Sequence, residues 1–197
     1  MDRDTLWGHI HRERNALAAT LRTLTPEQWQ HPSLCAGWTV KDVAAHVIST
    51  PQMGLGRTMG LFARNLGRGY NTMVFRETKR ISEAQSTDQI LADFETYATS
   101  RHKVATTTTV EPLLDALVHH QDIVQPLGLR HAMDPTAAAV AADRVRLLAP
   151  LMGTRRAIRG VRMVATDVDW DRGKGRVVEA PIQELLMMCA GRSPVPT

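Results

Sequence analysis

The chain has 197 residues, of which 43% are hydrophobic and 22% charged, and its formal net charge at pH 7 is +4. This composition is typical of one globular domain with or without a small appendage, and it excludes a largely disordered chain. No stretch reaches the roughly 18 consecutive apolar residues of a membrane span, and the N-terminus lacks the apolar core of a signal peptide. We therefore expect a cytoplasmic protein without a membrane partner.

Basic residues and cysteines bear on two further properties, nucleic-acid binding and disulfide bonding. The densest basic run, "GTRRAIRGVR" at 153–162, is short, has no interleaved aromatic residues and belongs to no helix-turn-helix or zinc-finger spacing. We expect it to form a solvated face or a small carboxylate-binding patch, and we expect no nucleic-acid partner. Cys35 and Cys189 lie far apart and match no C-x-x-C pattern, so reduced thiols are expected, with a disulfide as the alternative.

Helical signals dominate the first third of the chain. Apolar residues recur at helical spacing over 5–24. Thr25, Pro26 and Gln28 then form a capping box with proline at the first helical position, which predicts a short helical turn. The loop "HPSLCAGW" follows it.

The next helix is predicted to begin after Thr39, a good N-cap with Asp42 three residues later. Pro51 should kink or stop this helix, and nearby glycines weaken the following segment, which we expect to be helical but irregular as far as Asn65.

Two further helices are expected in the middle of the chain. The stretch 73–84 is moderately helical, and the capping box of Ser86 and Gln89 opens a third long helix. A fourth long helix is predicted to begin at Pro112 and to end near Pro126 and Gly128.

The pattern changes toward the C-terminus. A helix is predicted from Asp134, as N-cap, to about Ala149. The segment "VRMVATDVDW" then alternates as a strand does, the glycine-rich "DRGKG" is expected to turn, and "RVVEA" is expected to return as a second strand before a final helix. The sequence thus predicts a mainly helical protein with a small α+β element from about 155.

The fourth helix carries a polar stripe. Asp115, His119 and Asp122 are spaced i, i+4 and i+7, which places them within roughly 60° of one another on a helix. The helix is otherwise apolar nearly all round, so it is expected to be buried. A buried carboxylate and imidazole are costly unless something pairs with them, so the stripe needs a partner elsewhere in the chain.

His46 is the candidate partner, because it lies at the margin of an apolar helix face. Helix bundles build metal sites from inward-facing histidines and carboxylates. His46, Asp115 and His119 would supply three ligands and leave one position open, as at a catalytic zinc. Asp122 is either a further ligand or an acceptor for a ligand imidazole. The alternative is that His46 bonds a neighbouring carbonyl while Asp115 and His119 form a satisfied pair.

Signals for nucleophilic or phosphate chemistry are weak. The sequence contains no G-x-S-x-G, phosphate loop or dinucleotide fingerprint. Cys35 has His31 and His46 nearby in sequence, but no spacing requires contact between them.

Several segments together resemble the mycothiol-dependent maleylpyruvate isomerase family. They are "PSLCAGWTVKDVAAHV" (32–47), "GYNTMVFRETKRISEAQSTDQILADF" (69–94), "LLDALVHHQDIVQPLGL" (113–129) and "VRMVATDVDWDRGKGRVVEAPIQELLMMCAGR" (161–192). The resemblance covers most of the chain in order.

This resemblance implies a fold and a metal site. It implies a DinB-like four-helix bundle over 1–152, followed by a short C-terminal α+β extension over 153–197, a β-hairpin plus a helix. It assigns a divalent metal, usually taken as zinc, to His46, Asp115 and His119, with Asp115 where the family pattern has glutamate.

The resemblance also implies a cosubstrate and a reaction. Mycothiol, a low-molecular-weight thiol, would bind the metal and attack a small electrophile, in a cis-trans isomerase or a thiol S-transferase. Arg192, in the last "GR", corresponds to an arginine thought to hold a substrate carboxylate. The alternative is a non-catalytic DinB-like binding or stress-response protein with or without metal. Substrate identity and the choice between monomer and homodimer stay open.

Overall fold

The computed structural model describes residues 1–104 and 106–192 and divides the chain into two compact units. The first unit runs from Met1 to His131, and the second begins at Ala132. The helix that follows Asp134 lies in the second unit of this division, and the domain boundary at 152/153 stays a prediction from the sequence. Among the described residues, no helix combines the length and apolar character needed to cross a membrane.

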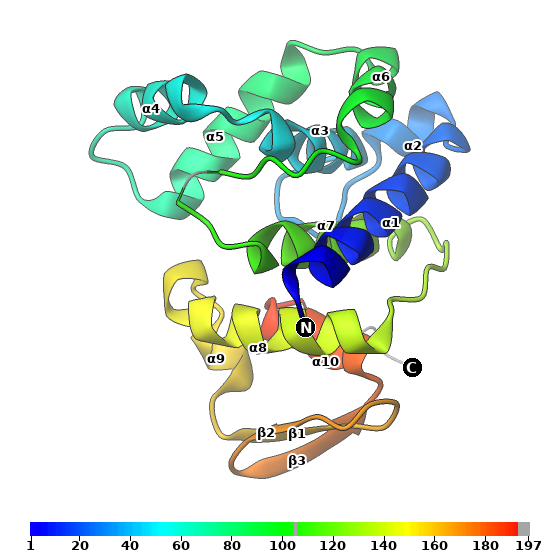
Figure 1. The fold of residues 1–197 in the computed structure, drawn as a ribbon, viewed down its shortest axis with the longest axis vertical. Helices are drawn as coiled ribbons and strands as arrows, with labels where there is room; N and C mark the ends of the chain where they lie inside the picture. The colour runs from blue at the N-terminus through cyan, green and yellow to red at the C-terminus, as the bar shows by residue number, and fades with distance from the viewer. Residues whose placement is uncertain (105, 193–197) are drawn as a thin grey trace. The chain divides into compact units, whose positions relative to one another are not determined.

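Helices build the whole of the first unit (Figure 1). In chain order they are α1 (Arg3–Arg22), α2 (Pro26–Gln30), α3 (Val40–Ser49), the short 3-10 helix η1 (Thr50–Gln52), α4 (Leu55–Arg64), α5 (Tyr70–Glu83), α6 (Thr87–Tyr97) and α7 (Val110–Val124). Helices α1 and α3 each pack against both α6 and α7, which closes a four-helix bundle, and α5 packs on the side of α3. The mainly helical class is confirmed.

Local signals explain where these helices begin. Thr25, Thr39 and Ser86 each accept a hydrogen bond from the third helical backbone N–H in a complete capping box. The α-helix α3 ends at Ser49, just before Pro51, as expected, and Pro51 lies within η1. One boundary differs from the prediction: α7 begins at Val110, two residues before Pro112. Proline is tolerated there because backbone N–H groups in the first helical turn have no acceptor within the helix, so its lack of an N–H costs no hydrogen bond.

The second unit contains helices and a three-stranded sheet. Its elements are α8 (Pro135–Met152), α9 (Arg155–Ile158), β1 (Val161–Ala165), β2 (Asp171–Gly173), β3 (Arg176–Ala180) and α10 (Ile182–Cys189). Helix α8 packs on α10, and the strand order is β2-β1-β3. The expected hairpin between 161–170 and 176–180 is wrong, because residues of the expected turn form β2, which pairs antiparallel with β1, and β3 lies parallel to β1 on its other side.

Two glycines explain this topology. The chain leaves β2 and passes across the start of β1 to reach its other edge within two residues. Gly173 and Gly175 adopt φ values of 96° and 113°, and a Cβ on either would collide with the carbonyl oxygen of Val161 or Gly160. Only glycine combines this backbone conformation with such a close approach.

Substitution of Gly175 by alanine is predicted to cost more than backbone strain alone. Gly153, the C-cap of α8, provides the control, because it also has a positive φ but has open space around its Cβ position. Gly153→Ala should lower the free energy of unfolding by about 1 to 2 kcal/mol, the cost of the left-handed conformation. Gly175→Ala should lower it further in urea denaturation, and equal losses would contradict the crossing described above.

Candidate metal centre

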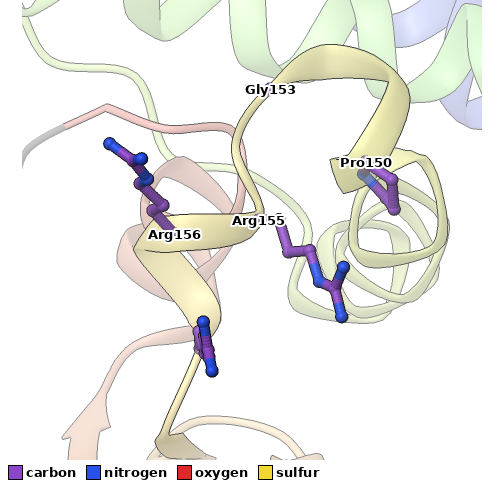
Figure 2. Close-up of a pocket in the computed structure, with 5 residues that line it drawn as sticks. Pro150, Gly153, Arg155 and Arg156 are labelled. Atoms are coloured by element: carbon purple, nitrogen blue, oxygen red, sulfur yellow. The ribbon is translucent and has the colours of Figure 1, made fainter.

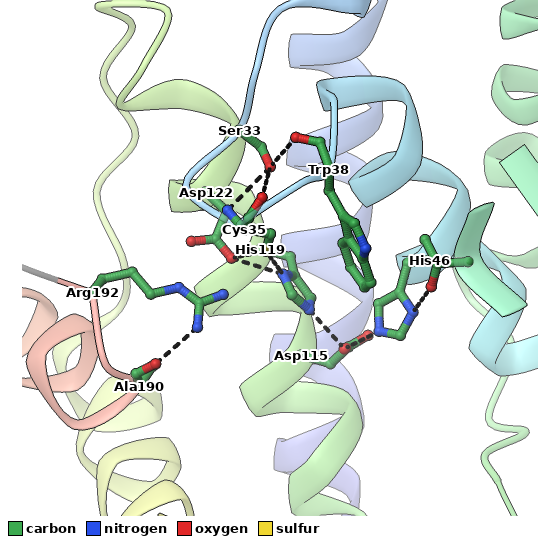
Figure 3. Close-up of polar contacts among 10 residues, drawn as sticks. Ser33, Cys35, Trp38, His46, Asp115, His119, Asp122, Ala190 and Arg192 are labelled. Atoms are coloured by element: carbon green, nitrogen blue, oxygen red, sulfur yellow. Dashed lines mark hydrogen bonds and ion pairs between the residues drawn. The ribbon is translucent and has the colours of Figure 1, made fainter. Parts of the chain in front are cut away.

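Helices α3 and α7 bring His46, Asp115 and His119 together (Figure 3). The Nε2 atoms of His46 and His119 lie 3.1 Å and 3.4 Å from the same oxygen, Oδ1 of Asp115. The two imidazole rings meet nearly at right angles, with centroids 5.1 Å apart. All three side chains are largely buried, so the structure assembles the three predicted ligands on one point.

The outward-facing nitrogens of both histidines are also held. Nδ1 of His119 lies 2.8 Å from Oδ2 of Asp122, and Nδ1 of His46 lies 3.2 Å from the Thr78 hydroxyl on α5. Because an ionised carboxylate only accepts hydrogen bonds, Nδ1 of His119 carries the hydrogen. Nε2 of a neutral His119 then directs a lone pair at Asp115. This arrangement is repulsive unless a proton or a metal ion lies between the two atoms.

The pKa values of Asp115 and His119 are shifted by their surroundings in directions that agree with this geometry. Burial by itself would raise the pKa of Asp115, but His46 and His119 outweigh burial and hold this pKa well below its usual range. Burial would lower the pKa of His119, yet Cys35, Asp115 and Asp122 together raise it well above the usual value. The site therefore holds a positive charge beside Asp115.

The loop between α2 and α3 supports both histidines. Trp38 is buried against them, with ring centroids 5.2 Å from His46 and 6.1 Å from His119. The Ser33 hydroxyl donates to the Trp38 carbonyl, which fixes this loop. The capping box of Thr39 then starts α3, so that His46 comes two turns later.

Cys35 joins this network, although its spacing in the sequence gave no sign of it. Its Sγ lies 3.0 Å from Oδ2 of Asp122 and 3.6 Å from Nδ1 of His119, and the Leu34 N–H donates to the Asp122 carbonyl. Oδ2 of Asp122 thus contacts both Sγ of Cys35 and Nδ1 of His119. Cys35, His119 and Asp122 are therefore paired with one another and form a second group of possible ligands beside the first.

A separate buried cluster contains Glu13, His120 and His131. Oε1 of Glu13 lies 2.7 Å from Nδ1 of His120 and 2.8 Å from Nε2 of His131. The two rings stack with centroids 3.8 Å apart and 22° between their planes. Stacked rings do not converge on one point as those of His46 and His119 do, so this cluster is a direct ion-pair network between α1, α7 and the segment after α7.

A cavity of about 710 Å³ lies beside the His46 and Asp115 side chains. Helices α4 and α5 supply much of its wall, which mixes apolar residues such as Leu61, Phe62 and Met73 with cationic ones. The site therefore faces a space large enough for a small molecule.

Glu77 organises the cations of this wall. It accepts hydrogen bonds from Arg64 at 3.1 and 3.2 Å, from Arg80 at 2.9 Å and from Asn65 at 3.2 Å. Burial alone would raise the pKa of Glu77, but these bonds outweigh it and lower the pKa to about 2. Glu77 thus binds two arginines and ties the end of α4 to α5.

The second unit holds the remaining predicted residues. Arg192 follows α10, and its Nη1 donates to the Ala190 carbonyl at 2.8 Å, so its substrate-binding role stays a prediction. The basic run contributes Arg155, Arg156 and Arg159 to a separate cavity of about 590 Å³. Figure 2 shows the side chains of Arg155 and Arg156 pointing away from each other, so these two do not converge on one anion.

Comparison with known proteins identifies the family. The model of the mycothiol maleylpyruvate isomerase N-terminal domain matches residues 10–112, which is more than half of the chain. The chain belongs to this family. The matched range includes His46 and ends three residues before Asp115.

Solved structures show the same fold. A crystal structure of the mycothiol-dependent maleylpyruvate isomerase superposes on this member of the family with a TM-score of 0.63 at 12% identity, over 98% of this chain and 91% of that one. A histidine-to-alanine mutant of the isomerase gives 0.59 at 12% identity, with the same coverage. The predicted fold class is therefore confirmed, whereas no curated protein matches the sequence.

Glu77 is predicted to make the free energy of unfolding depend on pH. A carboxyl group whose pKa is lowered on folding stabilises the protein above its ordinary pKa of 4.5, and this contribution fades as the pH falls toward 2. Glu77→Gln should therefore lower the free energy of unfolding by about 2 kcal/mol at pH 6 and by progressively less below pH 4.5.

Urea denaturation of the wild-type protein and of the Glu77→Gln variant between pH 3 and pH 6 measures this difference in the free energy of unfolding. Glu83→Gln, at an exposed carboxylate at the end of α5, is the matched control and should change little. A difference for Glu77→Gln that does not vary with pH would contradict the assigned ion pairs.

Proposed function

We propose that this protein is a metal-dependent and mycothiol-dependent enzyme, a cis-trans isomerase or thiol S-transferase that acts on a small electrophile. His46, Asp115 and His119 hold the divalent metal, which we take to be zinc, and Asp122 orients His119. The observation that carries the proposal is the shared Asp115 oxygen, toward which both Nε2 atoms point while both Nδ1 atoms are bonded elsewhere.

The donor set fits such an ion. Ligands around a tetrahedral zinc lie about 3.3 Å from one another, and the two nitrogens lie 3.1 and 3.4 Å from the oxygen of Asp115. Two nitrogens and one oxygen leave a fourth position for an exchangeable ligand, as in catalytic zinc sites. The shorter side chain of Asp115, relative to the family's glutamate, already reaches both histidines.

A zinc ion held by these residues would lower the pKa of a bound thiol and so would supply the thiolate nucleophile that the proposed reaction needs. The chain supplies the surroundings of this chemistry. Asp122 keeps the hydrogen of His119 on Nδ1 and so presents Nε2 to the site. The apolar part of the cavity wall limits the access of water to the reacting sulfur.

Charged residues would position the substrate. Arg64 and Arg80 are bound to Glu77, whereas Arg57 contacts the uncharged Gln52, so Arg57 is the cation of this wall most available to a substrate carboxylate. The family resemblance gives Arg192 a similar role. The substrate is accordingly a small anionic electrophile.

Metal content tests the first half of the proposal. Protein purified without a histidine tag should contain about one zinc per chain by mass spectrometry, and His46→Ala or His119→Ala should abolish stoichiometric binding. Asp122→Asn should weaken zinc binding about 10- to 100-fold. His102→Ala, at an exposed histidine outside the site, is the control. Zinc content that survives His119→Ala would overturn the ligand assignment.

Turnover tests the second half. The zinc-loaded protein should consume maleylpyruvate or a model electrophile with mycothiol as the thiol, and Asp115→Ala should abolish this activity together with the metal. Full metal occupancy without turnover with any thiol would instead support a non-catalytic binding or stress-response protein with the same fold.

A further inference from the structure

Helix α4 exposes an apolar stripe of four side chains. Leu55, Met59 and Phe62 follow the spacing i, i+4, i+7, and Leu66, just beyond the end of the helix, continues it. Their exposed fractions are 70%, 64%, 48% and 86%. On a helical wheel Leu55, Met59 and Phe62 fall within roughly 60°, and Leu66 lies in the turn that follows the helix. We refer to these four residues as the α4 stripe.

One flank of the α4 stripe is polar and faces the rest of the first unit. Thr58 and Asn65 are buried there, and Arg64 and Asn65 bind Glu77 on α5. The buried side chains of this segment are therefore polar and its apolar stripe is exposed, whereas a helix on a globular surface normally buries its apolar side.

This helix also lacks other sources of stability. It has ten residues, no side-chain N-cap and only sparse packing against the other helices, in contrast to α3. Isolated helices of this length are marginal in water and depend on packing of an apolar face. The α4 stripe thus requires a partner surface.

We propose that α4 docks against α4 of a second copy of this chain, as an antiparallel pair about a two-fold axis. In this pairing Leu55 meets Leu66 of the second copy, and Met59 meets Phe62 of the second copy. Both pairs are centred on the same point, between Gly60 and Leu61. The stripe is therefore complementary to itself, which a two-fold interface requires.

Width and charge favour a helix as the partner. A stripe of about 60° is typical of a helix-to-helix seam, whereas helices that lie on membranes have a broader apolar face with cations at its flanks. Arg57 and Arg64 fall roughly 180° from the α4 stripe on the wheel, so equal charges do not meet across the axis. The four side chains of the α4 stripe together expose on the order of 600 Å². Each partner in a standard protein interface buries about 800 Å², so the two areas are similar.

The interface would adjoin the candidate metal centre without being part of it. Phe62 belongs to both the α4 stripe and the cavity wall, whereas Leu55, Met59 and Leu66 do not line the cavity. Dimerisation would hold one wall of the cavity in place. The proposal does not depend on metal or thiol binding.

Sedimentation equilibrium of the full chain tests the association. The wild-type protein should behave as a dimer at micromolar concentration, and Leu55→Gln or Leu66→Gln should weaken the dimer about tenfold or more. Leu147→Gln, at a leucine of α8 that is 69% exposed, is the matched control and should leave association unchanged. A monomer at every concentration, or a dimer insensitive to both α4 variants, would overturn the proposal.

Engineered cysteines test the antiparallel orientation. The double variant Leu55→Cys/Leu66→Cys should form disulfide-linked dimers under mild oxidation, because each cysteine lies opposite the other type in the second copy. Leu55→Cys alone should not, because its two copies would lie about 16 Å apart along the pair, beyond the reach of a disulfide. Cross-linking of the single variant would show a parallel pairing and overturn the proposed one, and wild-type protein controls for the native cysteines.

Discussion

The contact of the Asp115 carboxylate with His46 and His119 is the interaction on which the site depends. The carboxylate is a negative charge among largely buried groups at the point where α3 and α7 pack together, and it is within reach of the Nε2 atoms of His46 and His119. Such a charge is tolerated in the interior only when a cation accompanies it. A protonated His119 supplies that cation when no metal is bound, and a divalent ion can take the place of the proton. The same contact therefore stabilises the bundle and marks the place where we propose that a metal binds.

Around this contact, the first unit is organised to fix the two imidazoles. Asp122 and Thr78 hold their outer nitrogens, and Trp38 packs against both rings. Cys35 shares the Asp122 oxygen with His119, which links the loop before α3 to α7. These supporting groups come from three separate segments, so the geometry of the proposed metal ligands depends on the packing of the whole bundle. A rigid ligand set with one open side is what thiol activation requires.

Helical spacing predicted much of this site, because Asp115, His119 and Asp122 lie on one helix and their common face follows from the sequence alone. The pairing with His46 required the assumption of a bundle, which the apolar faces supported. Thr78 and Cys35 carried no such signal, since their contacts join segments whose alignment depends on tertiary packing. The parallel third strand was likewise hidden, because alternation predicts a strand but not its neighbour. Helix α4 reverses the usual reading, since its apolar spacing alone would predict a buried face.

X-ray absorption spectroscopy at the zinc edge tests the central claim most directly, because it reports which elements bind the metal. The zinc-loaded protein should show only nitrogen and oxygen ligands, as His46, Asp115 and His119 supply, and addition of mycothiol should introduce one sulfur ligand. A sulfur ligand before any thiol is added would place the metal at Cys35 or Cys189 and contradict the account.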